Sequence, residues 1–100
     1  LGQKDIYAKI GAGLRLQEPG LDLGLVAAVL SSCHERALPP KSLFWGEVDL
    51  SGQVRPVMGQ DIRLKQAKRL GYDPIICPIG KKNGVELCTN IEALQDMLFA

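Results

Sequence analysis

The stretch WGEVDLSGQVRPV, residues 45–57, predicts how the middle of this chain folds. Two runs that favour extended structure, 43–50 and 53–57, flank Ser51-Gly52, and this spacing predicts a β-hairpin with a tight two-residue turn. Pro56 has no backbone N–H to give to a ladder, so we expect the second arm at a sheet edge or at the end of its ladder. The other elements are predicted on either side of this hairpin.

Before the hairpin, the chain alternates loosely over 5–16 with a break at Gly11-Ala12-Gly13, a pattern typical of a bulged or bent strand. A turn at Pro19-Gly20 leads into a predicted helix over 21–36. Apolar residues cover nearly every face of that helix, so we expect it to be sandwiched between other elements. Pro39-Pro40 ends it.

After the hairpin, residues 60–70 predict a helix that Gly71 stops. The spacing places one group of side chains inward, Leu64, Ala67 and Leu70, and another outward, Lys65, Lys68 and Arg69. We expect the inner group to pack and the outer group to form a cationic surface.

The last third of the chain predicts a buried strand over 73–78, a basic loop over 80–84 and a half-exposed strand over 85–88. Thr89 or Asn90 is expected to cap a final helix over 91–99. The predicted order is therefore strand, helix, hairpin, helix, strand, strand, helix.

Composition limits what the chain can be. Its 100 residues suffice for one small domain, 1–100, with an aliphatic core. Twelve basic and 11 acidic residues leave a net charge of +1, so any contact with DNA must come from a local patch rather than a long-range field. Cys33, Cys77 and Cys88 include no CxxC pair, and we expect buried thiols in a reducing cytoplasm and no metal site. The longest apolar run, 21–30, is about half the length of a membrane span, so no membrane contact is expected.

Three segments, read together, resemble the Lon-protease-like domain that closes the RadA/Sms proteins: residues 16–23, 45–57 and 63–72. The resemblance covers about residue 5 to residue 99 and implies an α/β (α+β) fold of the ribosomal-protein domain 2-like type, with a mixed sheet and helices packed mainly on one face. It also implies that the chain is one piece of a longer protein. A zinc ribbon and a RecA-like ATPase that forms hexameric rings on DNA would precede it. Zinc, ATP and magnesium are therefore expected only upstream, with no cofactor in this domain.

Active relatives of the Lon type hydrolyse peptides with a serine nucleophile and a lysine base, and such a dyad needs both a hydroxyl and a neutral amine. The position that matches the serine is Gly20, and the lysine position falls on or near Asp61. We therefore expect no catalytic residues here. Two alternatives remain: a Lon-family serine-lysine peptidase whose dyad lies elsewhere in the chain, and the Lon-like domain of a magnesium-chelatase-like competence ATPase.

Basic residues form the one patch that predicts a function. The candidate DNA-binding residues are Arg55, Arg63, Lys65, Lys68 and Arg69, joined by Lys81 and Lys82. Each cation that neutralises a phosphate releases a condensed counterion, so a few together would give salt-sensitive DNA affinity. Together with the resemblance, the patch predicts a non-catalytic domain of a DNA repair and recombination ATPase, with ring self-association and DNA as its contacts.

Other polar residues have simpler interpretations. Asp22 shares a helical stripe with apolar residues, and we expect it to cap the helix or to stabilise its dipole, with an interface salt bridge as the alternative. Glu47 and Asp49 share one face of a strand and are expected in salt bridges or solvent rather than in acid–base chemistry. His34 is predicted at the surface, and Trp45 in the core or at a subunit contact.

Overall fold

The computed structural model describes residues 19–80 and 84–100. In chain order, the elements are η1 (Pro19–Leu21), α2 (Asp22–His34), β1 (Leu43–Phe44), β2 (Glu47–Val48), β3 (Val54–Arg55), α3 (Gln60–Arg69), β4 (Ile75–Cys77), β5 (Val85–Leu87) and α4 (Ile91–Phe99). The strand predicted over 5–16 and the lysines of the basic loop, Lys81 and Lys82, lie outside the described residues.

The centre of the domain is a parallel sheet in the order β1-β4-β5. All three residues of β4 are buried, as expected for a parallel strand covered on both faces. Their side chains alternate: Ile76 packs into one apolar cluster, and Ile75 and Cys77 pack into the other. The buried strand predicted over 73–78 is confirmed.

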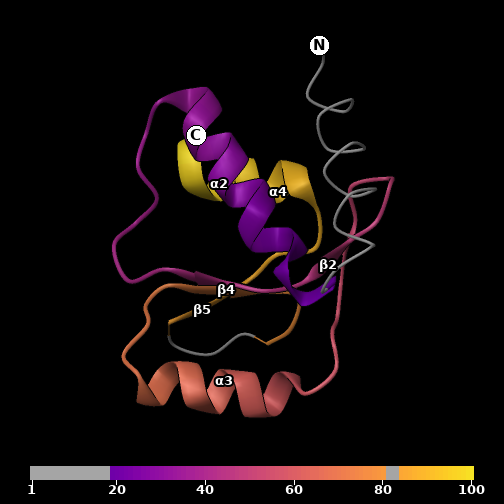
Figure 1. Ribbon diagram of the computed structural model, residues 1–100, viewed down its shortest axis with the longest axis vertical. Coiled ribbons are helices and arrows are strands. Elements are labelled where there is room, and N and C mark those ends of the chain that lie inside the picture. Colours follow the sequence, from indigo (N-terminus) through magenta and orange to yellow (C-terminus); the bar gives the residue numbers. More distant parts are fainter. Residues whose placement is uncertain (1–18, 81–83) are drawn as a thin grey trace.

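Helices cover both faces of this sheet. Figure 1 shows α2 and α4 together on one side and α3 alone on the other. The α2 and α4 cluster contains Leu23, Val26 and Leu94, whereas the α3 cluster is built around Trp45 and Ala67. The domain is therefore an α/β fold, with two of the three described α-helices on one face.

The predicted hairpin forms with two changes. β2 and β3 pair antiparallel, with Val48 opposite Val54, but β1 belongs to the parallel sheet because the chain bends at Gly46, whose φ is 151°. The two-residue turn is wrong. Asp49 N–H donates to the Gln53 carbonyl at 3.0 Å, which leaves the three residues 50–52 in the loop. The third of them, Gly52, has φ 86° and supplies the left-handed residue that closes such a loop.

The helix ends follow local chemistry. The Asn90 side chain accepts the Ala93 N–H at 2.7 Å and caps α4, as predicted. Helix α3 ends at Arg69, so Leu70 is its C-cap. The inward position predicted for Leu70 is wrong, because it is 59% exposed. Residues three apart drift by about 60° around a helix, so the stripe that begins at Leu64 has left the packed face two steps later.

Within the described part of the chain, helix α2 packs through one face. Leu23 and Val26 are buried, whereas Leu25 and Ala28 are exposed. The sandwiched position predicted for this helix is therefore wrong for its outer face. It ends at His34, two residues before the predicted end, because Glu35 adopts a left-handed conformation with φ 52°.

Candidate functional site

The residue predicted to match a catalytic serine, Gly20, lies at the entry to α2. Gly20 is a buried residue of η1, and its carbonyl accepts the Gly46 N–H at 3.2 Å. The Gly46 carbonyl in turn accepts the Leu23 N–H at 3.1 Å. These two hydrogen bonds attach the start of α2 to the residue that precedes β2, so the backbone around Gly20 is held in place.

The side chain of Arg63, from α3, fills the space beside Gly20. A Cβ on Gly20 would lie 3.3 Å from Nη2 and 3.6 Å from Cζ of Arg63, and its three nearest atoms all belong to that guanidinium. Asp61 lies on α3 as an exposed residue. A guanidinium stays protonated in proteins and cannot take a proton from a nucleophile. The chemical group beside the vacant position is thus a permanent cation.

Two of the four serine hydroxyls in the described residues have partners other than a lysine. Ser51 Oγ donates to Asp49 Oδ1 at 2.6 Å, and Ser31 Oγ donates to the Arg36 carbonyl at 2.5 Å. Within residues 19–80 and 84–100, no hydrogen bond joins a serine hydroxyl to a lysine. Lys65, a turn beyond Asp61, is exposed.

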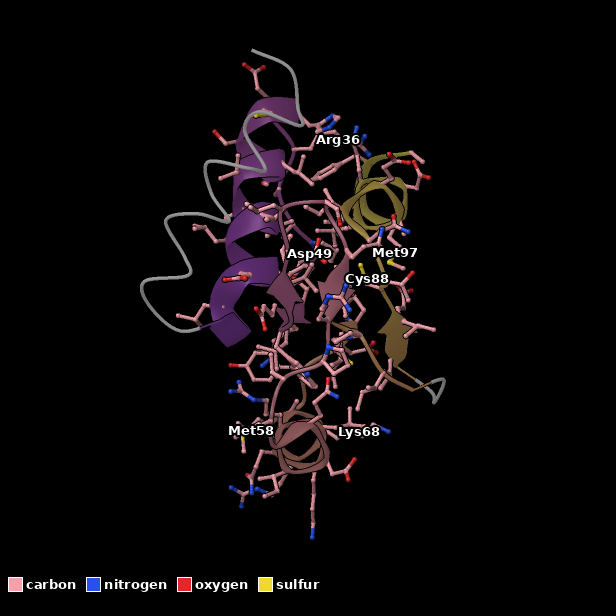
Figure 2. All side chains as sticks on the ribbon, turned by 90° about the vertical axis from the view of Figure 1, so that its right-hand side faces the viewer. Arg36, Asp49, Met58, Lys68, Cys88 and Met97 are labelled. Atoms are coloured by element: carbon pink, nitrogen blue, oxygen red, sulfur yellow. The ribbon has the colours of Figure 1, made fainter. Side chains whose placement is uncertain are left out.

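The predicted cations separate into three places. Lys65, Lys68 and Arg69 are exposed on the outer side of α3 and lie within about 100° of one another around the helix. We call these three residues the α3 cationic face. Figure 2 shows Lys68 projecting from α3. Arg63 is on another side of the helix and faces Gly20.

Arg55 belongs to the hairpin rather than to this face. Its Nε donates to Asp49 Oδ2 at 3.0 Å, and Glu47 lies opposite it on β2. The Asp49 carboxylate also accepts the Ser51 hydroxyl and the N–H groups of Ser51 and Gln53. These hydrogen bonds stabilise the ionised carboxylate and lower the pKa of Asp49 from its usual 3.8 to about 2. The Ser51 hydroxyl makes the largest contribution. The salt bridge expected for Asp49 is confirmed.

Comparison with known proteins finds similarity to proteins named DNA repair protein RadA. The chain is 33% identical over 97 residues to the DNA repair protein RadA of Rickettsia bellii, and this match covers 97% of the chain and 22% of that protein. The match to RadA of Synechocystis is 38% identical over 86 residues, or 86% of the chain and 17% of the relative. The chain is 42% identical over 79 residues to RadA of Brucella abortus, and this match covers 79% of the chain and 17% of that protein. The chain belongs with the RadA proteins. No family model matches it, and it spans about a fifth of the length of the curated RadA relatives it matches.

In this RadA-related chain, Asp22 differs from its prediction. It is fully buried, and its Oδ2 accepts the Val48 N–H of β2 at 2.8 Å. The N-cap of α2 is Leu21, without a side-chain cap, so the interpretation of Asp22 as a cap is wrong. The carboxylate is in the first turn, where the helix dipole favours it, but its hydrogen bond joins α2 to β2. The helical pattern around Asp22 could not predict that its partner would be the Val48 N–H, because that group lies on a strand 26 residues later.

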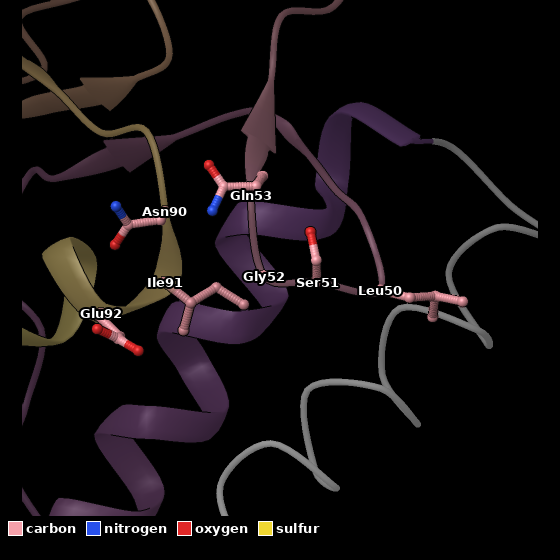
Figure 3. Close-up of a pocket in the computed structure, with 7 residues that line it drawn as sticks. All are labelled: Leu50, Ser51, Gly52, Gln53, Asn90, Ile91 and Glu92. Atoms are coloured by element: carbon pink, nitrogen blue, oxygen red, sulfur yellow. The ribbon is translucent and has the colours of Figure 1, made fainter.

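A groove of about 420 Å³ lies between the hairpin tip and the start of α4 (Figure 3). Residues 50–53 line one side and residues 90–92 the other. The polar side chains are the amides of Gln53 and Asn90, the Ser51 hydroxyl and the Glu92 carboxylate. Ser51 already donates to Asp49, and no amine or imidazole of residues 19–80 and 84–100 lines the groove, so the lining residues form no acid–base pair for hydrolysis. Sequence reasoning did not single out this groove.

Trp45, His34 and Arg36 make packing contacts and structural hydrogen bonds. Trp45 is 3% exposed, and its Nε1 donates to Gln60 Oε1 at 3.4 Å, which confirms its core position. His34 stacks on Phe99 with ring centroids 4.5 Å apart, and Arg36 Nη1 donates to the Phe99 carbonyl at 3.0 Å. The imidazole is half-buried rather than at the surface as predicted, because it closes the end of α4.

Two kinds of feature, metal-ligand clusters and membrane-spanning helices, are absent from the part of the chain that the structure describes. It contains no group of three or more His, Cys, Asp or Glu side chains arranged to hold a metal ion. None of its helices has the length and apolar character needed to cross a membrane. Cys77 and Cys88 are buried as predicted, but Cys33 is exposed: it follows the stripe of buried Val26 around α2 but lies near the C-terminal end of the helix, beyond Leu30, its last buried residue.

Proposed function

We propose that this chain is a non-catalytic domain of a RadA-type DNA repair protein and that it contacts the DNA backbone through the α3 cationic face. The observation that carries the non-catalytic part is the Arg63 guanidinium against Gly20, since it leaves neither a nucleophile nor a base at the position of the hydrolytic dyad. Under this proposal the ATP, magnesium and zinc sites belong to other parts of the protein.

Charge is distributed in a way that supports the DNA contact. Helix α3 carries four cations and one carboxylate, whereas α4 carries Glu92 and Asp96 and no cation. The two helices lie on opposite faces of the sheet (Figure 1). A domain with this polarity is drawn to a polyanion with α3 leading and α4 turned away. The small net charge is therefore compatible with binding through one side.

Salt dependence tests the proposal. Each phosphate neutralised on duplex DNA contributes about −0.9 to the slope of log K against log salt, so three contacts contribute about −2.7. We expect a triple substitution of Lys65, Lys68 and Arg69 by Gln to remove a slope of that size, measured by fluorescence anisotropy on a labelled duplex. The matched control substitutes Gln for Glu92 and Asn for Asp96, and its affinity should stay the same or rise. A triple variant that binds like the wild type would overturn the proposal.

We also propose that the domain takes part in assembly of a ring, hexameric in the full protein. Met58 and Ile62 support this, because they are 93% and 70% exposed near the start of α3. Around the helix, Ile62 is about 20° from Arg69 and about 60° from Lys65 but about 120° from Lys68, so a protein contact there adjoins one edge of the α3 cationic face and leaves Lys68 open. Sedimentation of the wild type against a Met58→Gln, Ile62→Gln variant tests it: equal sedimentation at every concentration would contradict a role for this surface.

A further inference from the structure

We propose that Lys41, together with Lys68, holds a backbone phosphate of duplex DNA at the C-terminal end of α3. This inference rests on the DNA contact proposed above and extends it to a residue outside the α3 cationic face. Lys41 follows Pro39-Pro40, and nothing in its local sequence indicates that it lies near α3. Tertiary contacts bring it there.

Backbone hydrogen bonds fix the position of Lys41. The Ser42 N–H donates to the Pro39 carbonyl at 3.2 Å, and Lys41 itself has a left-handed φ of 65°. Its carbonyl accepts the Asp73 N–H at 2.9 Å. The loop that carries Lys41 is thereby attached to the segment that leaves α3.

Tyr72 is the link between Lys41 and α3. The Tyr72 N–H donates to the Ala67 carbonyl at 3.1 Å, so its ring is held at the end of the helix. The Lys41 ammonium lies 5.8 Å from the centroid of that ring, within range of a cation–π contact. Lys68 lines a groove of about 340 Å³ together with Tyr72 and Asp73. The two lysines therefore both adjoin Tyr72.

The chemistry of this place suits a phosphate rather than a base. Neither lysine forms an ion pair within the described part of the chain, so both ammonium groups are available to an anion. The Tyr72 ring has Lys41 over it and packs against the Trp45 and Ala67 cluster, so a base could stack on it only by displacing the Lys41 ammonium or the packed side chains. Asp73 lines the same groove and repels a phosphate that enters it. A phosphate at the mouth of the groove meets the cations and avoids that carboxylate.

Anisotropy titrations of a labelled 20-base-pair duplex over a range of salt concentrations test the inference. We expect Lys41→Gln to lower the salt slope by about 0.9, the contribution of one phosphate, and Lys41→Arg to retain it. Asp73→Asn should raise the affinity. Arg36→Gln is the charge-matched control, because Arg36 contacts Phe99 of α4 on the other face of the sheet, and its slope should equal that of the wild type.

The outcomes separate this inference from the proposed function. If the triple α3 variant loses affinity while Lys41→Gln binds like the wild type, the inference is overturned and the proposed function stands. If Lys41→Gln lowers the slope while the triple variant, which lacks Lys68, does not, Lys68 holds no phosphate, and both the pairing of Lys41 with Lys68 and the α3 cationic face are overturned. If Lys41→Gln and Arg36→Gln lower the salt slope equally, the change follows from net charge alone, and the inference is overturned. A wild-type chain that binds no duplex at low salt overturns both.

Discussion

The guanidinium of Arg63 lies against Gly20, with Nη2 3.3 Å from the point where a Cβ would stand. A hydroxyl restored at this position would meet a permanent cation instead of a neutral amine. We therefore expect Gly20→Ser to fold, because the neighbouring atoms are the far end of a flexible side chain, and to hydrolyse no peptide. A fluorogenic peptide assay and a serine-reactive probe measure this. Probe labelling of Gly20→Ser but not of the wild type would contradict the expectation, and labelling of the wild type would revive the peptidase alternative.

Gly46 should tolerate no side chain. Its φ is 151°, and an added Cβ would lie 2.7 Å from Val54 Cγ1. Backbone strain and overpacking each cost on the order of 1–3 kcal/mol, so Gly46→Ala should lower the free energy of unfolding by about 3 kcal/mol. Urea denaturation measures it. Gly59→Ala is the control, because Gly59 also has a positive φ, 75°, but no atom within 4 Å of the added Cβ, and it should cost only about 1 kcal/mol. Equal losses would contradict the steric explanation.

Removal of the Asp22 carboxylate should destabilise the junction of α2 with β2. The side chain is fully buried and accepts the Val48 N–H at 2.8 Å, and hydrogen bonds to charged groups contribute about 1.5–3 kcal/mol. We expect Asp22→Ala to lower the free energy of unfolding by about 2 kcal/mol or more, by urea denaturation. The exposed Asp96→Ala on α4 should change it by less than about 0.5 kcal/mol. An unchanged free energy of unfolding in Asp22→Ala would show that this hydrogen bond does not contribute to stability.

The turn at Asp49 should make stability depend on acid pH. The Ser51 hydroxyl, backbone N–H groups and Arg55 lower the pKa of Asp49 from 3.8 to about 2 in the folded chain. The stabilisation is therefore complete above about pH 4 and is lost as the pH falls through about 2, because the unfolded chain takes up the proton first. We expect the urea midpoint of the wild type to fall more between pH 4 and pH 2 than that of Asp49→Asn. Parallel curves would contradict the assigned partners.

Thiol reactivity should distinguish the three cysteines. Cys33 is exposed, whereas burial raises the pKa of Cys77 and raises that of Cys88 to about 11, so neither forms the reactive thiolate near neutral pH. A chromogenic disulfide reagent at pH 8 should titrate Cys33 in the folded chain and all three thiols in urea. Cys33→Ser serves as the control and should show no fast reaction. Fast labelling of Cys88 in the folded state would contradict its burial.

Local patterns in the sequence were enough for most of the elements. The period of the apolar residues predicted α3 within one residue of its end, and Asn90 before an apolar run predicted the start of α4. The buried strand at 75–77 was predicted by a short apolar run between prolines. Such features depend on neighbours along the chain, because helical hydrogen bonds, caps and strand alternation all act within a few residues.

The candidate site was predicted only in its residue types. Gly20 removes a nucleophile whatever surrounds it, and an outward cationic side of α3 follows from helical spacing. Which side chain occupies the space beside Gly20 could not be predicted, because Arg63 lies 43 residues later and reaches Gly20 only once the chain has folded. Arg55 counted as a free cation until the hairpin placed Asp49 within 3.0 Å of it.

The sequence by itself therefore determined the order of the described elements, a glycine at the position where a serine was expected in active relatives, and the relation to RadA that nearly the whole chain supports. Tertiary structure decided the rest: that β1 leaves the hairpin for a parallel sheet, that Asp22 bonds to β2, and that Lys41 lies beside Tyr72. The physical reason is the separation along the chain over which each kind of interaction acts. Propensities act between near neighbours, whereas burial and ion pairing depend on which distant segments the folded core brings together.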